Sequence, residues 1–305
     1  MNYKFLFFLA MAMTTGACSQ NSDVNPAERV NSIANDFVEG FYSQYPEEAY
    51  ESGFPNAPTD RFSDQSTTGI MAWDASVDEW IKQMDGIDVS TLNGTPEAIT
   101  WMFARDRLQA IVDRRVCRTH LWNVSPTWTG WHTLVASTLA LQPVETTEEK
   151  QRALARAADL ERFIDTEISN LRRGVEEGYL APRTNVSSVI GQISSLIDTT
   201  IEDSPYFGPA ARSEDAEFVA AYRDVMAKNV LPAMLRYRGY LAEEYEGRDE
   251  IGVRNNPDGE ECYRASVRSW SSLIIDPEQI HRTGLAQMSR IRGEMLAVEI
   301  GRAHV

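Results

Sequence analysis

Histidine, cysteine and the signatures of common enzyme sites are scarce in this sequence. Its 305 residues include four histidines and three cysteines. No histidine is followed by glutamate, so no HExxH zinc helix is present, and no CxxC or Cys/His cluster has zinc-finger spacing. The sequence also has no GxSxG nucleophile elbow, no GxGxxG and no P-loop. These absences argue against a zinc site within the chain, a serine hydrolase and a nucleotide-binding domain.

Basic residues are outnumbered by acidic ones. The chain has 29 Lys and Arg against 45 Asp and Glu, a formal net charge of −16. Because binding of nucleic-acid phosphates needs a basic face, we expect no nucleic-acid partner. The acidic balance by itself indicates solubility rather than a particular substrate. With 43% hydrophobic residues, the chain can build a substantial core.

Alternating strand patterns are also missing, apart from two short candidates near residues 251–254 and 271–275. Apolar residues instead recur at helical spacing, as in Val30, Ile33, Ala34, Phe37, Val38 and Phe41. Thr146-x-x-Glu149 is a capping box that starts a long helix. Residues 213–245 are predicted to form the longest helix, with a kink at Pro232. We therefore predict an all-α fold, a bundle of long helices.

The N-terminus has the pattern of a lipoprotein signal peptide, residues 1–17. A short positive segment precedes apolar residues 5–13, which are too few to span a bilayer, and small residues lead to Cys18. Thr15 departs from the usual leucine, and an ordinary signal peptide cut near Ala17 is the alternative. We expect export, lipidation of Cys18 with residues 18–26 as a tether, and membrane attachment through that lipid. Ser19 favours the outer membrane, facing the periplasm or cell surface.

Residues 27–299 are expected to form one helical domain that is truncated. The last six residues, 300–305, are what the start of a common sequencing-library adapter would encode, so we expect a non-native tail there.

The remaining candidate residues support no catalytic or metal-ligand assignment. Cys117 and Cys262 can pair in an oxidising compartment, but two cysteines also occur by chance as free buried thiols, which is the alternative. Tyr263 and Arg264 follow a turn at 256–259 and could offer a hydroxyl and a planar cation to a carboxylate. A surface ion pair beside a packed tyrosine is the alternative, and the same choice holds for Arg183.

Other polar and aromatic candidates are weaker still. The pair Glu278 and His281 has the spacing of a metal pair but occurs once, on a helix opened by Asp276-Pro277, and a solvated helix face explains it better. The segment from Trp122 to Trp131 holds three tryptophans. It is the contact surface to expect if the chain is a binding module.

Several segments resemble the bacterial family catalogued as domain of unknown function 885. They are residues 46–64, 121–149, 171–186 and 204–210, and most specifically IGVRNNPDGEECYRASVR (251–268) and DPEQIHRTGLAQMSRIRGEM (276–295). The resemblance implies an exported protein, often a lipoprotein, whose largely helical body is the N-terminal part of a zincin-like metallopeptidase fold. Family members are longer, and their HExxPGHH-type motif lies beyond the last segment.

The resemblance therefore implies an N-terminal fragment of a zinc peptidase-like protein that is inactive as it stands. Zinc and a peptide substrate are expected for the full-length family member, whereas no cofactor and no metal ligand can be assigned to this chain. Tyr263 and Arg264, and then Arg183, are the residues expected on the substrate side. A non-catalytic, peptide- or ligand-binding envelope lipoprotein is the alternative function.

Overall fold

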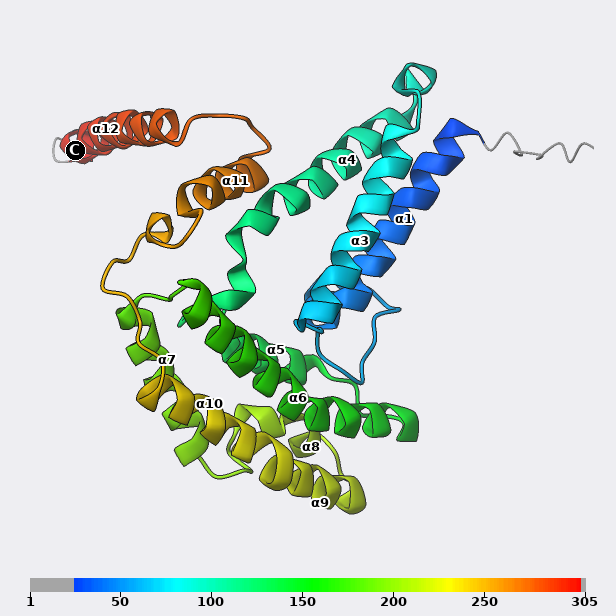
Figure 1. The fold of residues 1–305 in the computed structure, drawn as a ribbon, viewed down its shortest axis with the longest axis vertical. Coiled ribbons are helices and arrows are strands. Elements are labelled where there is room, and N and C mark those ends of the chain that lie inside the picture. The colour runs from blue at the N-terminus through cyan, green and yellow to red at the C-terminus, as the bar shows by residue number, and fades with distance from the viewer. Residues whose placement is uncertain (1–24, 303–305) are drawn as a thin grey trace, which may run out of the picture.

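The computed structural model describes residues 25–302, and the regular secondary structure of this part of the chain is helical (Figure 1). The predicted all-α class is confirmed. The helices are α1 (Pro26–Gln44), α2 (Ala49–Ser52), α3 (Thr67–Asp85), α4 (Pro96–Arg114), α5 (Trp131–Leu141), α6 (Thr147–Glu177), α7 (Arg183–Asp198), α8 (Gly208–Ala211), α9 (Ala216–Val225), α10 (Leu231–Glu243), α11 (Gly259–Ser271) and α12 (Pro277–Arg302). The signal peptide, Cys18 and most of the tether lie outside the described residues, as do residues 303–305.

Helices α1, α3 and α4 lie side by side and share one core (Figure 1). Asn25 caps α1 and Ser66 caps α3 through their side-chain oxygens. The helical spacing predicted from the sequence places apolar residues of all three helices inward, and the buried set includes Val30, Ile33, Phe37, Trp73, Val77, Met84 and Leu108. On α4, however, the spacing misleads, because Ile99, Met102 and Phe103 lie exposed.

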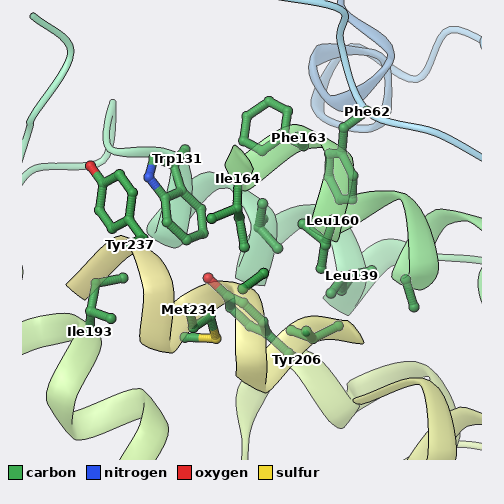
Figure 2. Packing of buried hydrophobic residues seen from close by; sticks show 14 of the residues in the cluster. Phe62, Trp131, Leu139, Leu160, Phe163, Ile164, Ile193, Tyr206, Met234 and Tyr237 are labelled. Carbon is green, nitrogen blue, oxygen red and sulfur yellow. The ribbon is translucent and has the colours of Figure 1, made fainter. Parts of the chain in front are cut away.

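A second and larger core is enclosed by α5 to α10 (Figure 2). Trp131 packs edge-on against Tyr237, with 5.1 Å between ring centroids. Leu160 and Ile164 of α6 are fully buried in this core. The Tyr206 hydroxyl donates to the His132 carbonyl at 2.7 Å, so this buried polar group is satisfied.

The longest helix is α6, with 31 residues, and the prediction that residues 213–245 form the longest helix was wrong. The Thr146–Glu149 capping box begins α6 as predicted. The predicted interruption near Pro232 is present as a π-helical turn, Met226–Val230, directly before α10. Because proline has no N–H and crowds the preceding turn, a widened turn at this point accommodates it.

Side chains of α6 bind the irregular segment 58–65 that connects the two cores. The Arg156 side chain donates to the carbonyls of Pro58 at 2.6 Å and Arg61 at 3.1 Å, and to Gln142 Oε1 at 2.9 Å. Asn170 donates to the Gln65 carbonyl at 2.8 Å. These bonds satisfy backbone carbonyls that no helix or sheet satisfies.

Both predicted short strands were wrong, because residues 253–255 form a 3-10 turn and Ser271 ends α11. The turn at 256–259 leads directly into α11, which packs on α4, with Arg268 bound to Asp106. In α12 every side chain from residue 278 to 298 is exposed. Among residues 25–302 no helix is both long and apolar enough to cross a membrane.

Replacing Arg156 with alanine should lower the free energy of unfolding by about 3 kcal/mol, because buried acceptors lose their donor. Arg152→Ala is the matched control, since Arg152 lies on the same helix and pairs with Glu148 in solvent. It should change stability by less than about 0.5 kcal/mol. Urea unfolding followed by circular dichroism measures both, and equal losses in the two variants would contradict the role given to Arg156.

Candidate functional site

A pocket of about 440 Å³ lies among α1, α3 and α4, at their ends nearest the turn 115–120. One part of its wall is apolar and includes Phe41, Tyr45, Ile70, Trp73 and Ile111. The other part is cationic and consists of Arg107, Arg114, Arg115 and Arg118, with the single carboxylate Asp74. In a chain of net charge −16, four arginines around one pocket are unusual.

The periodicity of α4 brings these arginines together. Arg107 and Arg114 are seven residues apart, two helical turns, so their side chains leave the same side of the helix. Arg118 follows the helix in a left-handed conformation, with φ 42°. Cations near a helix C-terminus are also favoured by the helix dipole.

Two of the pocket arginines are neutralised by acidic partners. Arg115 contacts Asp74 at 2.9 Å and Asp78 at 2.7 Å. Arg118 is bound to Glu177 of α6. These two side chains therefore act as structural ties between elements.

Arg107 and Arg114 differ, because no carboxylate in the described part of the chain pairs with either. Arg114 Nε is buried and has no hydrogen-bond partner among these residues. Burial, and then the neighbouring Arg107, lowers the pKa of Arg114. The pocket thus contains two uncompensated guanidinium groups, one of them partly desolvated.

His120 lies at the edge of the pocket as a neutral imidazole. Burial, and then Arg173 and Arg118, lowers its pKa to about 4. Its Nε2 is 2.6 Å from Arg173 Nη2. A guanidinium can only donate, so Nε2 accepts and the proton is on Nδ1. His120 therefore adds no positive charge near neutral pH.

The structure separates the predicted substrate residues from this pocket. Tyr263 and Arg264 lie on α11, where Tyr263 is half exposed and Arg264 pairs with Glu260 at 2.6 Å. Arg183 pairs with Asp249 at 2.9 Å, also in solvent. These contacts match the surface ion pairs that the sequence offered as the alternative, and a substrate role for the three residues stays a prediction. Glu278 and His281 lie on the exposed surface of α12.

The three tryptophans of the segment 122–131 do not form one surface. Trp131 is buried in the large core, and Trp122 donates its indole N–H to the Cys117 carbonyl at 2.9 Å. Only Trp128 of the three is exposed. The contact surface expected from the sequence is therefore reduced to one side chain.

Cys117 and Cys262 are joined by a disulfide in the structure, with their Cα atoms 4.7 Å apart. The bond links the turn after α4 to α11 across 145 residues of sequence. Ser269 of α11 also lines the pocket. The disulfide therefore fixes α11 beside the pocket wall.

The sequence patterns did not predict a role for the pocket arginines, although Arg107 and Arg114 are seven residues apart on one predicted helix. What the sequence does not show is which arginines lack an acidic partner. Among residues 25–302, no group of three or more His, Cys, Asp and Glu side chains could hold a metal ion. Zinc in the full-length family member stays an expectation from the resemblance.

Two carboxylates are buried near the junction of the two cores. Glu47 belongs to the turn after α1, and Glu167 belongs to α6. Glu47 accepts a hydrogen bond from the Ser63 N–H at 3.1 Å, whereas Glu167 Oε2 has no hydrogen-bond partner among the described residues. Burial, and then the proximity of Glu47, raises the pKa of Glu167 to about 8, and burial also raises that of Glu47. Shifted carboxylates can mark active sites. Because both are buried beyond the reach of a solvent-borne reactant, we assign them to the junction of the two cores.

The fold is that of an all-α protein with two cores, and it is shared with a solved structure. That structure is described as "the putative lipoprotein from Colwellia psychrerythraea" and superposes with a TM-score of 0.71 at 15% sequence identity. The match covers 89% of this chain and 50% of the other, so this chain spans about half the length of the structure it matches. None of the curated proteins compared with the chain matches it.

Residues 46–300 match the family described as "Bacterial protein of unknown function (DUF885)". The chain belongs to this family. The resemblance seen in the sequence is thereby confirmed.

Glu167 predicts a pH-dependent stability. The unfolded chain releases this proton near the ordinary glutamate pKa of 4.5, whereas burial raises the pKa of Glu167 in the folded protein to about 8. Over that interval the folded state holds one more proton, so Glu167 makes stability fall by about 1.4 kcal/mol per pH unit as pH rises. Glu167→Gln removes the titration, and its stability relative to the unmodified protein should increase steadily from pH 5 to 8.

Urea unfolding at a series of pH values measures this difference. Glu176→Gln, an exposed change on the same helix, is the control and should give a flat difference. A flat profile for Glu167→Gln as well would show that Glu167 is already ionised in the folded protein.

Proposed function

We propose that this chain is the helical N-terminal part of an exported, lipid-anchored protein resembling a zinc-dependent peptidase. By itself it does not hydrolyse peptides. Its membership of the family supports the proposal. So does the sequence, which contains no HExxH-type segment in any of its 305 residues. The zinc site, the peptide substrate and the hydrolytic step would belong to the longer protein.

The observation that carries the proposal is the exposed apolar surface of α12. Ile280, Leu285, Met288, Ile291 and Met295 are all exposed. At 100° per residue these side chains fall within one half of the helix surface. A helix in water exposes such a face only when another surface normally covers it.

Exposed apolar residues on neighbouring elements support the same explanation. Ile99, Met102 and Phe103 lie at i, i+3 and i+4 on α4, and α11 packs beside α4 (Figure 1). Trp270 and Ile274, at and just beyond the end of α11, are also largely exposed. The matched crystal structure is twice as long as the region this chain covers. We assign these surfaces to contact with the further polypeptide of the complete protein.

Export and lipid attachment rest on the N-terminal pattern that ends in Ala17-Cys18. The matched structure is itself described as a "putative lipoprotein", and the Cys117–Cys262 disulfide is typical of an oxidising compartment. The outer membrane, facing the periplasm or cell surface, is the location we propose.

The second candidate function is that of a non-catalytic binding lipoprotein. The pocket favours it, because its lining holds two arginines that have no acidic partner among the described residues. The open reading frame at the genomic locus separates the two functions. A continuation past codon 298 into an HExxH-type segment supports the peptidase-like protein, and a nearby stop codon supports the binding module.

The purified protein should retain no stoichiometric zinc after dialysis against buffer without metal, because it lacks the ligand set of a zinc helix. Metal analysis by mass spectrometry measures the ratio, and hydrolysis of a mixed peptide library should stay at the level of a buffer blank. Tight binding of one zinc ion per chain, or peptide cleavage abolished by a chelator, would refute the proposal.

Amide hydrogens of α12 should exchange far faster than those of α6, since an isolated helix without packing is only marginally stable. Hydrogen–deuterium exchange with mass spectrometry compares peptides from the two helices in one sample, so α6 serves as the internal control. Protection of α12 equal to that of α6 would show that its apolar face is already covered in this chain.

A further inference from the structure

We infer that the pocket among α1, α3 and α4 binds a small organic carboxylate that carries an aromatic or branched aliphatic group. No part of this inference depends on the proposed peptidase-like function. It rests on the two arginines of the pocket that have no acidic partner among the described residues, on the aromatic side chains in the same lining, and on the volume of the pocket.

The anionic part of the ligand is indicated by Arg107 and Arg114. Arg115 and Arg118 have acidic partners, whereas neither Arg107 nor Arg114 has one within the described residues. A guanidinium N–H that is buried without an acceptor costs free energy. Arg114 Nε is such a group, and a carboxylate would satisfy it through a charge-assisted, geometrically matched contact.

The apolar part of the ligand is indicated by an aromatic wall that is already rigid. Trp73 packs edge-on against Tyr45 and Phe41, with ring centroids 5.6 and 6.2 Å apart. Trp73 also packs against Trp80, which does not line the pocket, with 5.7 Å between ring centroids, and this contact restricts the Trp73 ring. A wall held in place in the free protein loses little conformational freedom when a ligand binds.

Tyr45 connects the two parts of the pocket. Burial raises the pKa of Tyr45 to about 12, so its hydroxyl stays a neutral donor at physiological pH. It is close enough to Arg114 for the two to interact electrostatically. The Tyr45 hydroxyl is therefore a neutral donor from the same lining that holds Arg114.

Size and charge exclude other ligand classes. A volume of about 440 Å³ suits a ligand of the size of an acylated amino acid rather than a folded partner. A metal cation is disfavoured by the four arginines. Inorganic phosphate would use the guanidinium groups and leave the aromatic wall without a contact, so an amphipathic carboxylate fits the whole lining best.

The test is isothermal titration calorimetry with N-acetyl-L-phenylalanine as the probe. One saturable site per chain is expected. N-acetyl-L-phenylalaninamide, which lacks the charge, should bind at least about tenfold more weakly, because a hydrogen bond to a charged group is lost. N-acetylglycine, which lacks the ring, should also bind at least about tenfold more weakly. Inorganic phosphate should not compete at equal concentration.

Arg114→Gln should weaken binding of N-acetyl-L-phenylalanine by roughly 10- to 100-fold, and Arg107→Gln should weaken it in the same direction. Arg29→Gln is the matched control. It removes the same charge from α1, but Arg29 lies on the first turn of that helix, far from Phe41 and Tyr45, and should leave affinity unchanged. Melting curves of all variants establish that they are folded.

Three results would overturn the inference. The first is the absence of saturable binding to the folded, unmodified protein. The second is equal affinity for the acid and the amide, or competition by phosphate as strong as by the acid. The third is an Arg114→Gln variant that melts normally and binds as tightly as the Arg29→Gln control.

Discussion

The arrangement of the two cores depends on the polar contacts that α6 makes with the irregular segment 58–65. This segment belongs to no helix or sheet, so its backbone groups must find partners elsewhere. Arg156 and Arg162 supply donors to its carbonyls, and Asp159 accepts from the Phe62 N–H at 2.8 Å. The buried Arg156 thus fixes the position of segment 58–65, which leads from α1 to α3.

The same helix also holds the end of the α3–α4 pair at which the pocket lies. Glu177, at the end of α6, binds Arg118, and Arg173 donates both to His120 and to the Thr67 hydroxyl. Gln65, Arg118 and His120, which belong to the segments that α6 contacts, line the pocket. Its shape therefore depends on α6 even though no α6 residue is among those that line it, and a change in how α6 packs on the large core would reach the pocket through charged contacts.

Most of the fold can be predicted from local patterns in the sequence. The capping box at Thr146, the Asp276-Pro277 helix start and the break near Pro232 each involve groups that interact within a few residues, so sequence spacing is sufficient. Burial was harder to predict. Ile99, Met102 and Phe103 have the spacing of a buried stripe, yet whether such a stripe is buried depends on a surface contributed from elsewhere.

The site was hidden for a related reason. Sequence spacing shows that Arg107 and Arg114 share one side of α4, but it cannot show that Asp74 and Asp78 pair with Arg115 alone. Only the three-dimensional arrangement tells which cations lack a partner. Tyr263 and Arg264 were selected because they follow a turn, and the structure places them on a helix that begins one residue after Asp258.

The arginine-lined pocket and the exposed apolar face of α12 differ in physical character, so they are independent of each other. The pocket is small, preformed and charged, and its walls belong to a packed three-helix unit. The face of α12 is long and apolar, and its side chains from residue 278 to 298 are exposed in the described part of the chain. A covering surface for α12 would act through apolar burial and would leave the charge on Arg114 unchanged. Covering the apolar face of α12 therefore leaves the two arginines of the pocket without an acidic partner, and binding of an anion in the pocket leaves that face exposed.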